Sequence, residues 1–526
     1  TTEIYTLSLH DALPIYHLRF LADLGVDAVI VQDLAVTRIC ADLGLHLPLH
    51  ASTMMNVSSP EAGAILKSWG VTRVVTSRDI TIAAARRIRD ASGIEVEIFL
   101  HGDMCSVLSG RCLTSGLIFG KSANRGQCMK PCRWAYDLQS EGTGRILKAN
   151  AHLLASKDLC LLQQLPELVE AGIDALKIEG RMRPAETLKP MVAAYRRALD
   201  RVLAEPLAAG RLPDEAAARW RSRTRDLTTG FAFRYPDASF VDATGEREPI
   251  IFSTHGGLRD LEAGTLPDLP NPRPGRASAG LPGLTVVVGT LAGAATALAG
   301  RCATLILSWE GDLSPTGGWT LAELAELAER ARAASARILL TTPQVLDGRS
   351  GRELHRVVAA GLSLDGFAIT EPAALQVLDG VPGERWAEPA MNVLNGESAT
   401  WLREHGVSRI APGLEASLED IAAMMGAAPE CAYDLLAHGP LVGMLVEHCL
   451  IAMHGHAGSK TDFCRMPCAA DSFSLVDCQG HRRTIHADRY CRNHIILERD
   501  VAMLPRLSRI VRSEEHTSEL QSPNTI

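Results

Sequence analysis

Most of the thirteen cysteines in this chain of 526 residues fall into two groups that repeat one another. In each group an isolated cysteine is followed, at a nearly equal distance, by a Cys-x3-Cys pair and then by one more cysteine. The first group is Cys105, Cys112, Cys128, Cys132 and Cys160, and the second is Cys449, Cys464, Cys468 and Cys491. Four thiolates that converge on one point are the ligand set of an iron–sulfur cluster or a structural zinc. The pattern therefore predicts a duplicated metal-binding module.

The first group offers five cysteines for four places. Alignment of the two groups favours Cys112, Cys128, Cys132 and Cys160, because these have counterparts in the second group. Cys105 has no counterpart, so it is either a ligand that replaces Cys132 or a free thiol. Spacing alone does not separate iron–sulfur from zinc, and buried cysteines without a metal are a further reading.

Composition places the chain among ordinary globular proteins, with 46% hydrophobic and 22% charged residues. We see no apolar run of about 18 residues and no secretory signal, so we expect a cytoplasmic protein with reduced thiols and no membrane partner. The net charge of −8 means that an RNA partner would have to bind a local basic patch.

Helix and strand signals alternate along both parts of the chain. The pattern predicts strands at 28–31, 47–50, 73–75, 96–100 and 175–179 and a helix at 184–203, and the alternation resumes at 284. Such winding predicts an α/β fold: a TIM-type (β/α) barrel, followed by a second barrel-like β/α module with its own cysteine cluster. The triplet Met55-Asn56-Val57 recurs as Met391-Asn392-Val393, which extends the repeat beyond the cysteines.

The expected boundaries follow from these patterns. Residues 16–235 form the first barrel module, 236–283 an irregular linker, and 284–511 the second module. Segments 1–15 and 512–526 do not continue the neighbouring periodicity and resemble translated sequencing-adapter read-through. We therefore expect the first barrel to be N-terminally truncated.

Several polar residues follow predicted strands of the first module. His50, His101, Glu179 and Arg181 are candidate catalytic residues, because the carboxyl ends of parallel barrel strands form the active face. Arg181 could also bind a substrate carboxylate. The alternatives are a structural ion pair at the rim and buried, satisfied histidines.

Residues around the cysteine loop are candidates for binding RNA. Lys157 could touch substrate, with helix capping by the neighbouring Asp158 as the alternative. Arg125, Lys130 and Arg133 surround the cysteine loop and, with Trp134, could neutralise and stack on single-stranded RNA. A solvated loop edge is the alternative.

Long stretches of the chain resemble peptidase family U32. They are FLHGDMCSVLSGRC (99–112), KSANRGQCMKPCRWAYDL (121–138), SKDLC (156–160) and AGIDALKIEGRM (171–182), together with CRMPC and DRYCRNHI in the second cysteine group. The similarity is to the branch of the family that makes 5-hydroxyuridine in tRNA and 5-hydroxycytidine in 23S rRNA.

That resemblance implies an oxygen-independent RNA hydroxylase with one or two [4Fe–4S] clusters and prephenate as the oxygen donor. Cys112, Cys128 and two of Cys105, Cys132 and Cys160 would hold the first cluster, and tRNA or rRNA would be the partner. The alternatives are a collagenase-like peptidase, a ubiquinone-pathway hydroxylase and a scaffold stapled by zinc. No Ser/His/Asp or HExxH arrangement is evident for a peptidase, although a dyad of Cys105 and His101 is conceivable.

Overall fold

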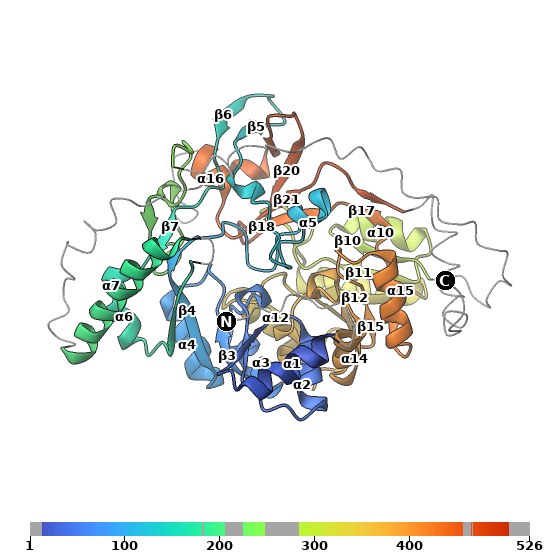
Figure 1. Cartoon of the computed structure of the whole chain (residues 1–526). Helices are drawn as coiled ribbons and strands as arrows, with labels where there is room; N and C mark the ends of the chain where they lie inside the picture. The colour runs from blue at the N-terminus through green and yellow to red at the C-terminus, as the bar shows by residue number, and fades with distance from the viewer. Residues whose placement is uncertain are drawn as a thin grey trace.

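The computed structural model describes residues 13–180, 183–205, 225–247, 283–455, 464 and 466–503. Two halves, each built on a seven-stranded sheet, lie side by side below a third, antiparallel sheet (Figure 1). Among the described residues, no helix combines the length and apolar character that a membrane span needs.

The first half carries a mixed sheet in the order β1-β2-β3-β4-β7-β9, with β8 also paired to β4. All neighbours are parallel except β4 and β7, which run antiparallel. The strands are β1 (Val29–Val31), β2 (Leu49–Ala51), β3 (Val71–Val75), β4 (Glu95–Gly102), β7 (Asp158–Cys160), β8 (Ala175–Ile178) and β9 (Leu227–Thr228). The helices are α1 (Leu13–Leu24), α2 (Leu34–Asp42), α3 (Pro60–Ser68), α4 (Ile82–Ser92), α6 (Leu165–Glu170) and α7 (Ala185–Ala204), with short 3-10 turns η1 (Thr53–Met55), η3 (Leu162–Gln164) and η4 (Ala238–Phe240).

The second half has an all-parallel sheet in sequential order from β10 to β16. Its strands are β10 (Thr285–Val288), β11 (Thr304–Leu307), β12 (Arg337–Thr341), β13 (Gly366–Ile369), β14 (Glu384–Ala387), β15 (Arg409–Ile410) and β16 (Ala432–Tyr433). Its helices are α10 (Leu291–Ala299), α11 (Leu321–Ala333), α12 (Ser350–Ala359), α13 (Ala373–Val377), α14 (Gly396–Glu404) and α15 (Leu418–Ala427), with the 3-10 turn η5 (Pro389–Met391).

Local sequence explains where these helices begin. Ser59 caps α3 by accepting a hydrogen bond from Ala62 N at 3.2 Å, and Pro60 occupies the first turn, where its missing N–H costs nothing. Gly70 follows α3 at φ 86°, a conformation that glycine adopts without strain.

The predicted α/β class is confirmed, and the sheets are curled. Over the residues that the structure describes, each sheet is open: β1 and β9 end the first path, and β10 and β16 end the second. A closed barrel would join such edges by hydrogen bonds, so the expected TIM-type closure is not seen in this part of the chain. α1 begins at Leu13, inside the predicted 1–15 segment. Most of the predicted linker, at 248–282, and the 512–526 segment lie outside the described residues.

Both cysteine regions build one six-stranded antiparallel sheet, in the order β18-β21-β20-β19-β5-β6. Its strands are β5 (Tyr136–Ser140), β6 (Ile146–Ala151), β18 (Val442–Val446), β19 (Phe473–Val476), β20 (Arg482–Ala487) and β21 (Asn493–Ile496). Beside it lie α5 (Thr114–Phe119), η2 (Pro131–Arg133), α16 (Leu450–Gly455), η6 (Pro467–Ala469) and a small ribbon of β17 (His438–Gly439) and β22 (Val501–Ala502).

The two copies meet through equivalent strands. β5 and β19 each follow their own Cys-x3-Cys pair, and they pair antiparallel with Leu138 opposite Leu475. Contact of the same surface on two copies is the arrangement of a two-fold symmetric dimer, here within one chain. The two cysteine regions, which the sequence assigns to separate modules, therefore contribute strands to one sheet.

Helices of the two halves also pack against each other, α2 on α14 and α3 on α13. Asp33 caps α2 through Ala35 N at 3.0 Å and also accepts hydrogen bonds from Ser398 and from Asn395 Nδ2, the latter at 2.7 Å. Arg38 adds ion pairs to the second half, with Glu397 at 2.8 Å. One carboxylate thus closes a helix and joins the halves.

We predict that Asp33→Ala lowers stability more than loss of an ordinary cap. The substitution removes the cap and strands two donors of the second half, at a cost of about 2–3 kcal/mol in the free energy of unfolding. Thr81→Ala is the matched control, because Thr81 caps α4 through Ala84 N at 3.1 Å and its loss costs about 1 kcal/mol. Urea unfolding of both variants measures the difference. Equal losses would contradict a role for Asp33 between the halves.

Candidate functional site

Four thiols of the first group interact electrostatically with one another. Burial raises the pKa of Cys112 well above its usual range, and Cys128, Cys105 and Cys132 raise it further. Burial followed by Cys105 also raises the pKa of Cys132. Like charges interact in this way only when they lie close together. The structure therefore brings Cys105 together with Cys112, Cys128 and Cys132.

Cys160 lies elsewhere. It ends β7, where it pairs with His101 of β4, and its Sγ is 3.6 Å from the hydroxyl of Tyr195. Burial raises its pKa, and no cysteine contributes to that shift. The alignment of the two groups favours Cys160 over Cys105, and the structure reverses that preference because β7 carries Cys160 into the first sheet.

The cysteines of the second group also lie close together. Burial raises the pKa of Cys468 to about 12, and Cys449, Cys491 and Cys464 contribute. Backbone amides donate to sulfur in both groups: Lys130 N to Cys128 at 3.3 Å and Ala452 N to Cys449 at 3.4 Å. Hydrogen bonds of this kind tune the electronic properties of sulfur ligands.

In the part of the chain that the structure describes, no three His, Cys, Asp or Glu side chains form a ready-made metal cage. The donor sets nonetheless have the right chemistry, since each supplies four soft sulfurs. The pKa values of Cys105, Cys112, Cys132, Cys449 and Cys468 are raised above the usual range of a thiol. Binding of a cation by these thiols would therefore have to release protons.

His50 and His101 do not share a cavity. His50 belongs to β2 and faces a row of charges on neighbouring strands, where Arg73 of β3 pairs with Glu95 at 2.7 Å and Lys177 pairs with Glu97 at 3.4 Å. Burial, followed by Arg73, lowers the pKa of His50. This half-buried histidine is one element of a charged strip across the sheet.

His101 is 3% exposed, and its Nδ1 lies 3.1 Å from the hydroxyl of Tyr195. Burial lowers its pKa to about 4, and Arg183 adds to the effect. The imidazole is therefore neutral at physiological pH. Its surroundings are those of a satisfied core histidine.

Glu179 accepts a hydrogen bond from Asp103 N at 3.3 Å, and a Cβ on Gly102 would lie 2.3 Å from the Glu179 carbonyl oxygen. Position 102, at φ 119°, thus needs glycine for both conformation and space. Arg181 lies outside the described residues.

The structure places the predicted RNA-binding residues in buried or half-buried positions. Arg133 and Trp134 are 1% and 4% exposed, which rules them out as a surface platform for stacking. Arg125 is half-buried near Glu415, whose pKa it lowers against the larger effect of burial. Lys157 is half-buried, with its backbone N bonded to Phe240 O at 2.9 Å.

Arg133 instead anchors a buried carboxylate. Arg133, Lys130 and Arg225 pair with Asp103 at 2.8, 2.8 and 2.9 Å. Burial alone would raise the pKa of Asp103, but these three cations lower it below its usual range. Basic residues around the cysteine loop therefore hold the loop together.

A buried charged cluster that the sequence did not single out spans the two cysteine groups. Arg492, which follows Cys491, is 1% exposed and pairs with Glu447 at 2.6 Å and with Asp347. Asp79 is buried, and neither of its carboxyl oxygens has a hydrogen-bond partner in the part of the chain that the structure describes. Burial, followed by Glu447, raises its pKa well above its usual range.

On the other side, Asp79 adjoins the first cysteine group. Arg78 stacks 4.3 Å over the ring of Phe99, and both Arg78 and Asp79 act on the thiol of Cys105. The polar run Ser77-Arg78-Asp79 directly after β3 was the available signal, since it follows a strand as His50 and Glu179 were expected to do. A protonated carboxyl there could donate a proton beside the cysteines.

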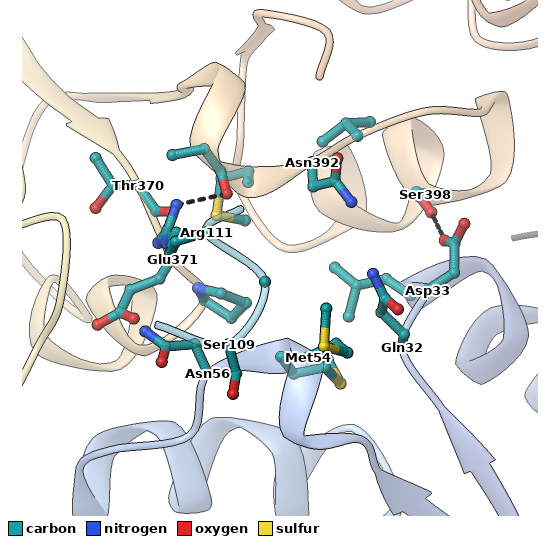
Figure 2. Close-up of a pocket in the computed structure, with 17 residues that line it drawn as sticks. Gln32, Asp33, Met54, Asn56, Ser109, Arg111, Thr370, Glu371, Asn392 and Ser398 are labelled. Atoms are coloured by element: carbon teal, nitrogen blue, oxygen red, sulfur yellow. Dashed lines mark hydrogen bonds between the residues drawn. The ribbon is translucent and has the colours of Figure 1, made fainter. Parts of the chain in front are cut away.

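A pocket opens between the two halves, where loops after strands of both sheets meet (Figure 2). Its walls come from Gln32, Asp33, Leu34, Met54, Met55, Asn56, Ser109, Gly110, Arg111, Thr370, Glu371, Pro372, Ala390, Met391, Asn392, Val393 and Ser398. Arg111 directly precedes Cys112 and reaches the second half, donating to Ala390 O at 2.8 Å, Thr370 O at 2.9 Å and Gln344 O at 3.0 Å. Arg111 thus connects the wall of the pocket to Cys112, the next residue of the chain.

The model of peptidase family U32 matches residues 11–242 and 314–517. The chain belongs to peptidase family U32. Both cysteine groups lie within the matched ranges, which confirms the resemblance that their motifs indicate.

Curated relatives within this family differ in their named activities. A tRNA hydroxylation protein of Bacillus subtilis is 34% identical over 39% of this chain and 50% of its own length. The 23S rRNA 5-hydroxycytidine synthase of Escherichia coli is 37% identical over 36% of this chain and 28% of its own. A collagenase of Porphyromonas gingivalis is 28% identical over 37% and 48%.

The chain therefore spans half or less of the length of these relatives. A solved structure of a U32 peptidase matches 31% of this chain and 71% of its own, at 14% identity and a TM-score of 0.24. That superposition is too weak to inform the fold or the function.

We predict that Glu371→Gln stabilises this U32 protein increasingly as pH rises. Glu371 is 4% exposed, and burial raises its pKa from 4.5 to about 7 against the opposing effect of Arg111. Between these values the folded state keeps a proton that the unfolded state has lost, so wild-type stability falls as pH rises from 4.5 towards 7.

Each unit of pH in that window costs the wild type about 1.4 kcal/mol, so the variant should gain up to about 3 kcal/mol relative to it. Urea unfolding between pH 5 and 8 measures the gap. Glu326→Gln, on the exposed face of α11, is the control and should run parallel to the wild type. A constant gap for Glu371→Gln would show that the buried carboxyl does not titrate there.

Proposed function

We propose that this protein is an iron–sulfur-dependent, oxygen-independent hydroxylase of pyrimidines in tRNA or rRNA. The observation that carries the proposal is similarity to proteins named for tRNA hydroxylation and for 5-hydroxycytidine synthesis. Prephenate is the proposed oxygen donor, on the resemblance set out above. A cytoplasmic location fits the reduced thiols and the RNA substrate.

The cysteines would hold two [4Fe–4S] clusters. Cys105, Cys112, Cys128 and Cys132 are the proposed ligands of the first, because their thiols act on one another while Cys160 stands apart. Cys449, Cys464, Cys468 and Cys491 are the proposed ligands of the second. Bound clusters would supply one-electron transfer at potentials tuned by the N–H···S bonds described above.

The protein's own groups would support that chemistry from the cluster of charges between the cysteine groups. Burial raises the pKa of Asp79 well above its usual range, and its carboxyl lies where it acts on Cys105, so it is suited to proton transfer beside the first site. The Arg492 pairs with Glu447 and Asp347 fix the opposite side. Burial of these groups keeps bulk water away from the reacting atoms.

A peptidase remains the second candidate, because the family carries that name and a collagenase is among the relatives. A cysteine nucleophile needs a lowered pKa. Burial instead raises the pKa of Cys105, and the Nδ1 of His101 faces Tyr195. These observations favour hydroxylation over peptide hydrolysis.

Mass spectrometry of tRNA and rRNA nucleosides tests the proposed function. A strain that lacks the gene should lose one hydroxylated pyrimidine, and the intact gene should restore it. A Cys112→Ser gene should fail to restore it, whereas Cys478→Ser, at an exposed cysteine outside both groups, should succeed. An unchanged nucleoside profile in the deletion strain would contradict RNA hydroxylation and direct attention to peptides and quinones.

We also predict the iron content of purified variants. After anaerobic reconstitution the wild type should hold about eight irons, and Cys105→Ser and Cys449→Ser about four each, since each removes a ligand of one [4Fe–4S] cluster. Cys160→Ser should keep about eight. Iron and zinc analysis with visible absorption measures this. A colourless zinc protein would contradict the cofactor, and iron loss in Cys160→Ser with none in Cys105→Ser would contradict the ligand assignment.

A further inference from the structure

The repeated Met-Asn-Val triplets line the pocket between the halves, one from each side. Asn56 lies on the wall of the first half and Asn392 on the opposite wall (Figure 2). Met55 and Met391 also line the pocket. Both asparagines adopt the left-handed conformation, at φ 53° and 54°. The duplication of the chain thus places two carboxamides and two thioethers around one cavity.

Asn56 is more than a turn residue. It is 4% exposed, and neither its Nδ2 nor its Oδ1 has a hydrogen-bond partner among the described residues. A left-handed turn alone would be satisfied by glycine, whereas a buried, unpaired carboxamide is costly. A protein can retain such an unpaired buried group where a bound ligand supplies the missing hydrogen bonds.

The pocket is not built for an anion. The Nη1 and Nη2 of its guanidinium, Arg111, already donate to three backbone carbonyls. The carboxyl groups of Asp33 and Glu371 also line it. A neutral ligand with hydrogen-bond donors and acceptors suits these walls better than a carboxylate or phosphate.

The size and the apolar lining narrow the choice. The cavity measures about 70 Å³, room for roughly five waters at about 10–15 Å³ each, which suits one small ring better than two fused rings. Met54, Met55 and Met391 supply polarisable sulfur that packs well on aromatic rings. A carboxamide offers a donor and an acceptor side by side, the pairing that reads the edge of a base.

We propose that this pocket binds a single pyrimidine base turned out of an RNA strand, with Asn56 reading its edge and the methionines packing on its faces. The site rests on the proposed function and names where its substrate base binds. Arg111, which lines the pocket, directly precedes Cys112 of the first cysteine group in the chain. Enzymes that modify bases in nucleic acids commonly take the base into such a slot.

Binding of short single-stranded RNAs to the full-length protein tests the proposal. One RNA carries a single cytidine or uridine in an otherwise abasic strand, and its partner is abasic at that position too. In the wild type the base should strengthen binding about tenfold or more. A purine at that position should strengthen binding less than a pyrimidine does. In Asn56→Gly the advantage of the pyrimidine should disappear, because glycine keeps the left-handed backbone and removes the carboxamide.

Asn150→Gly is the matched control, since Asn150 is also left-handed, at φ 44°, but is exposed on β6. Asn56→Gly should unfold at no lower urea concentration than this control, because it removes an unsatisfied buried group. The proposal would be overturned if a pyrimidine strengthened binding equally in Asn56→Gly and in the wild type. It would also be overturned if the wild type bound the pyrimidine RNA no better than the abasic RNA, or bound a purine RNA as well as the pyrimidine RNA. If binding depends on the pyrimidine but the cellular nucleosides are unchanged, the proposed hydroxylase function is contradicted, whereas the proposed base-binding pocket is supported.

Discussion

The antiparallel pairing of β5 with β19 is the contact on which the rest of the arrangement depends. It joins two copies of a cysteine-bearing segment through equivalent strands, with Leu138 opposite Leu475 in the core below the sheet. Since each strand directly follows a Cys-x3-Cys pair, the pairing brings both cysteine groups to one sheet. The halves beneath are then held face to face, and their loops enclose the pocket.

Buried charge gathers where the two copies meet. The charged groups between the two cysteine groups, Asp79, Glu447, Asp347 and Arg492, come from both halves. Arg492 pairs with Glu447 and Asp347, whereas the carboxyl of Asp79 has no hydrogen-bond partner among the described residues. Buried charges and unpaired polar groups cost folding free energy. Together with the unpaired Asn56, they make the centre of the molecule a region where function and stability compete.

Much of the β/α framework was predictable, because strands such as β11 and β13 are buried, mostly apolar runs that follow helices ending near a glycine, Gly300 and Gly361. Short strands escaped: β14 is Glu-Arg-Trp-Ala and β16 only two residues, too short and polar for a periodic signal. Among candidate site residues, spacing singled out the cysteine groups, whereas it did not single out Asp79 and Arg492, because single charged residues carry no pattern. His101 was expected at an active face. It is instead a neutral core residue, because it is buried and contacts the hydroxyl of Tyr195.

The sequence by itself determined the duplication, the serial β/α winding, the membership of family U32 and the two sets of sulfur donors, since spacing and local periodicity survive in one dimension. Only the tertiary structure decided that the two cysteine regions share a sheet, that Cys105 rather than Cys160 joins the first group, and that the repeated asparagines face one pocket. These depend on contacts between residues hundreds of positions apart, such as Asn56 and Asn392. Pairing of distant strands is set by packing and register, and no local pattern encodes it.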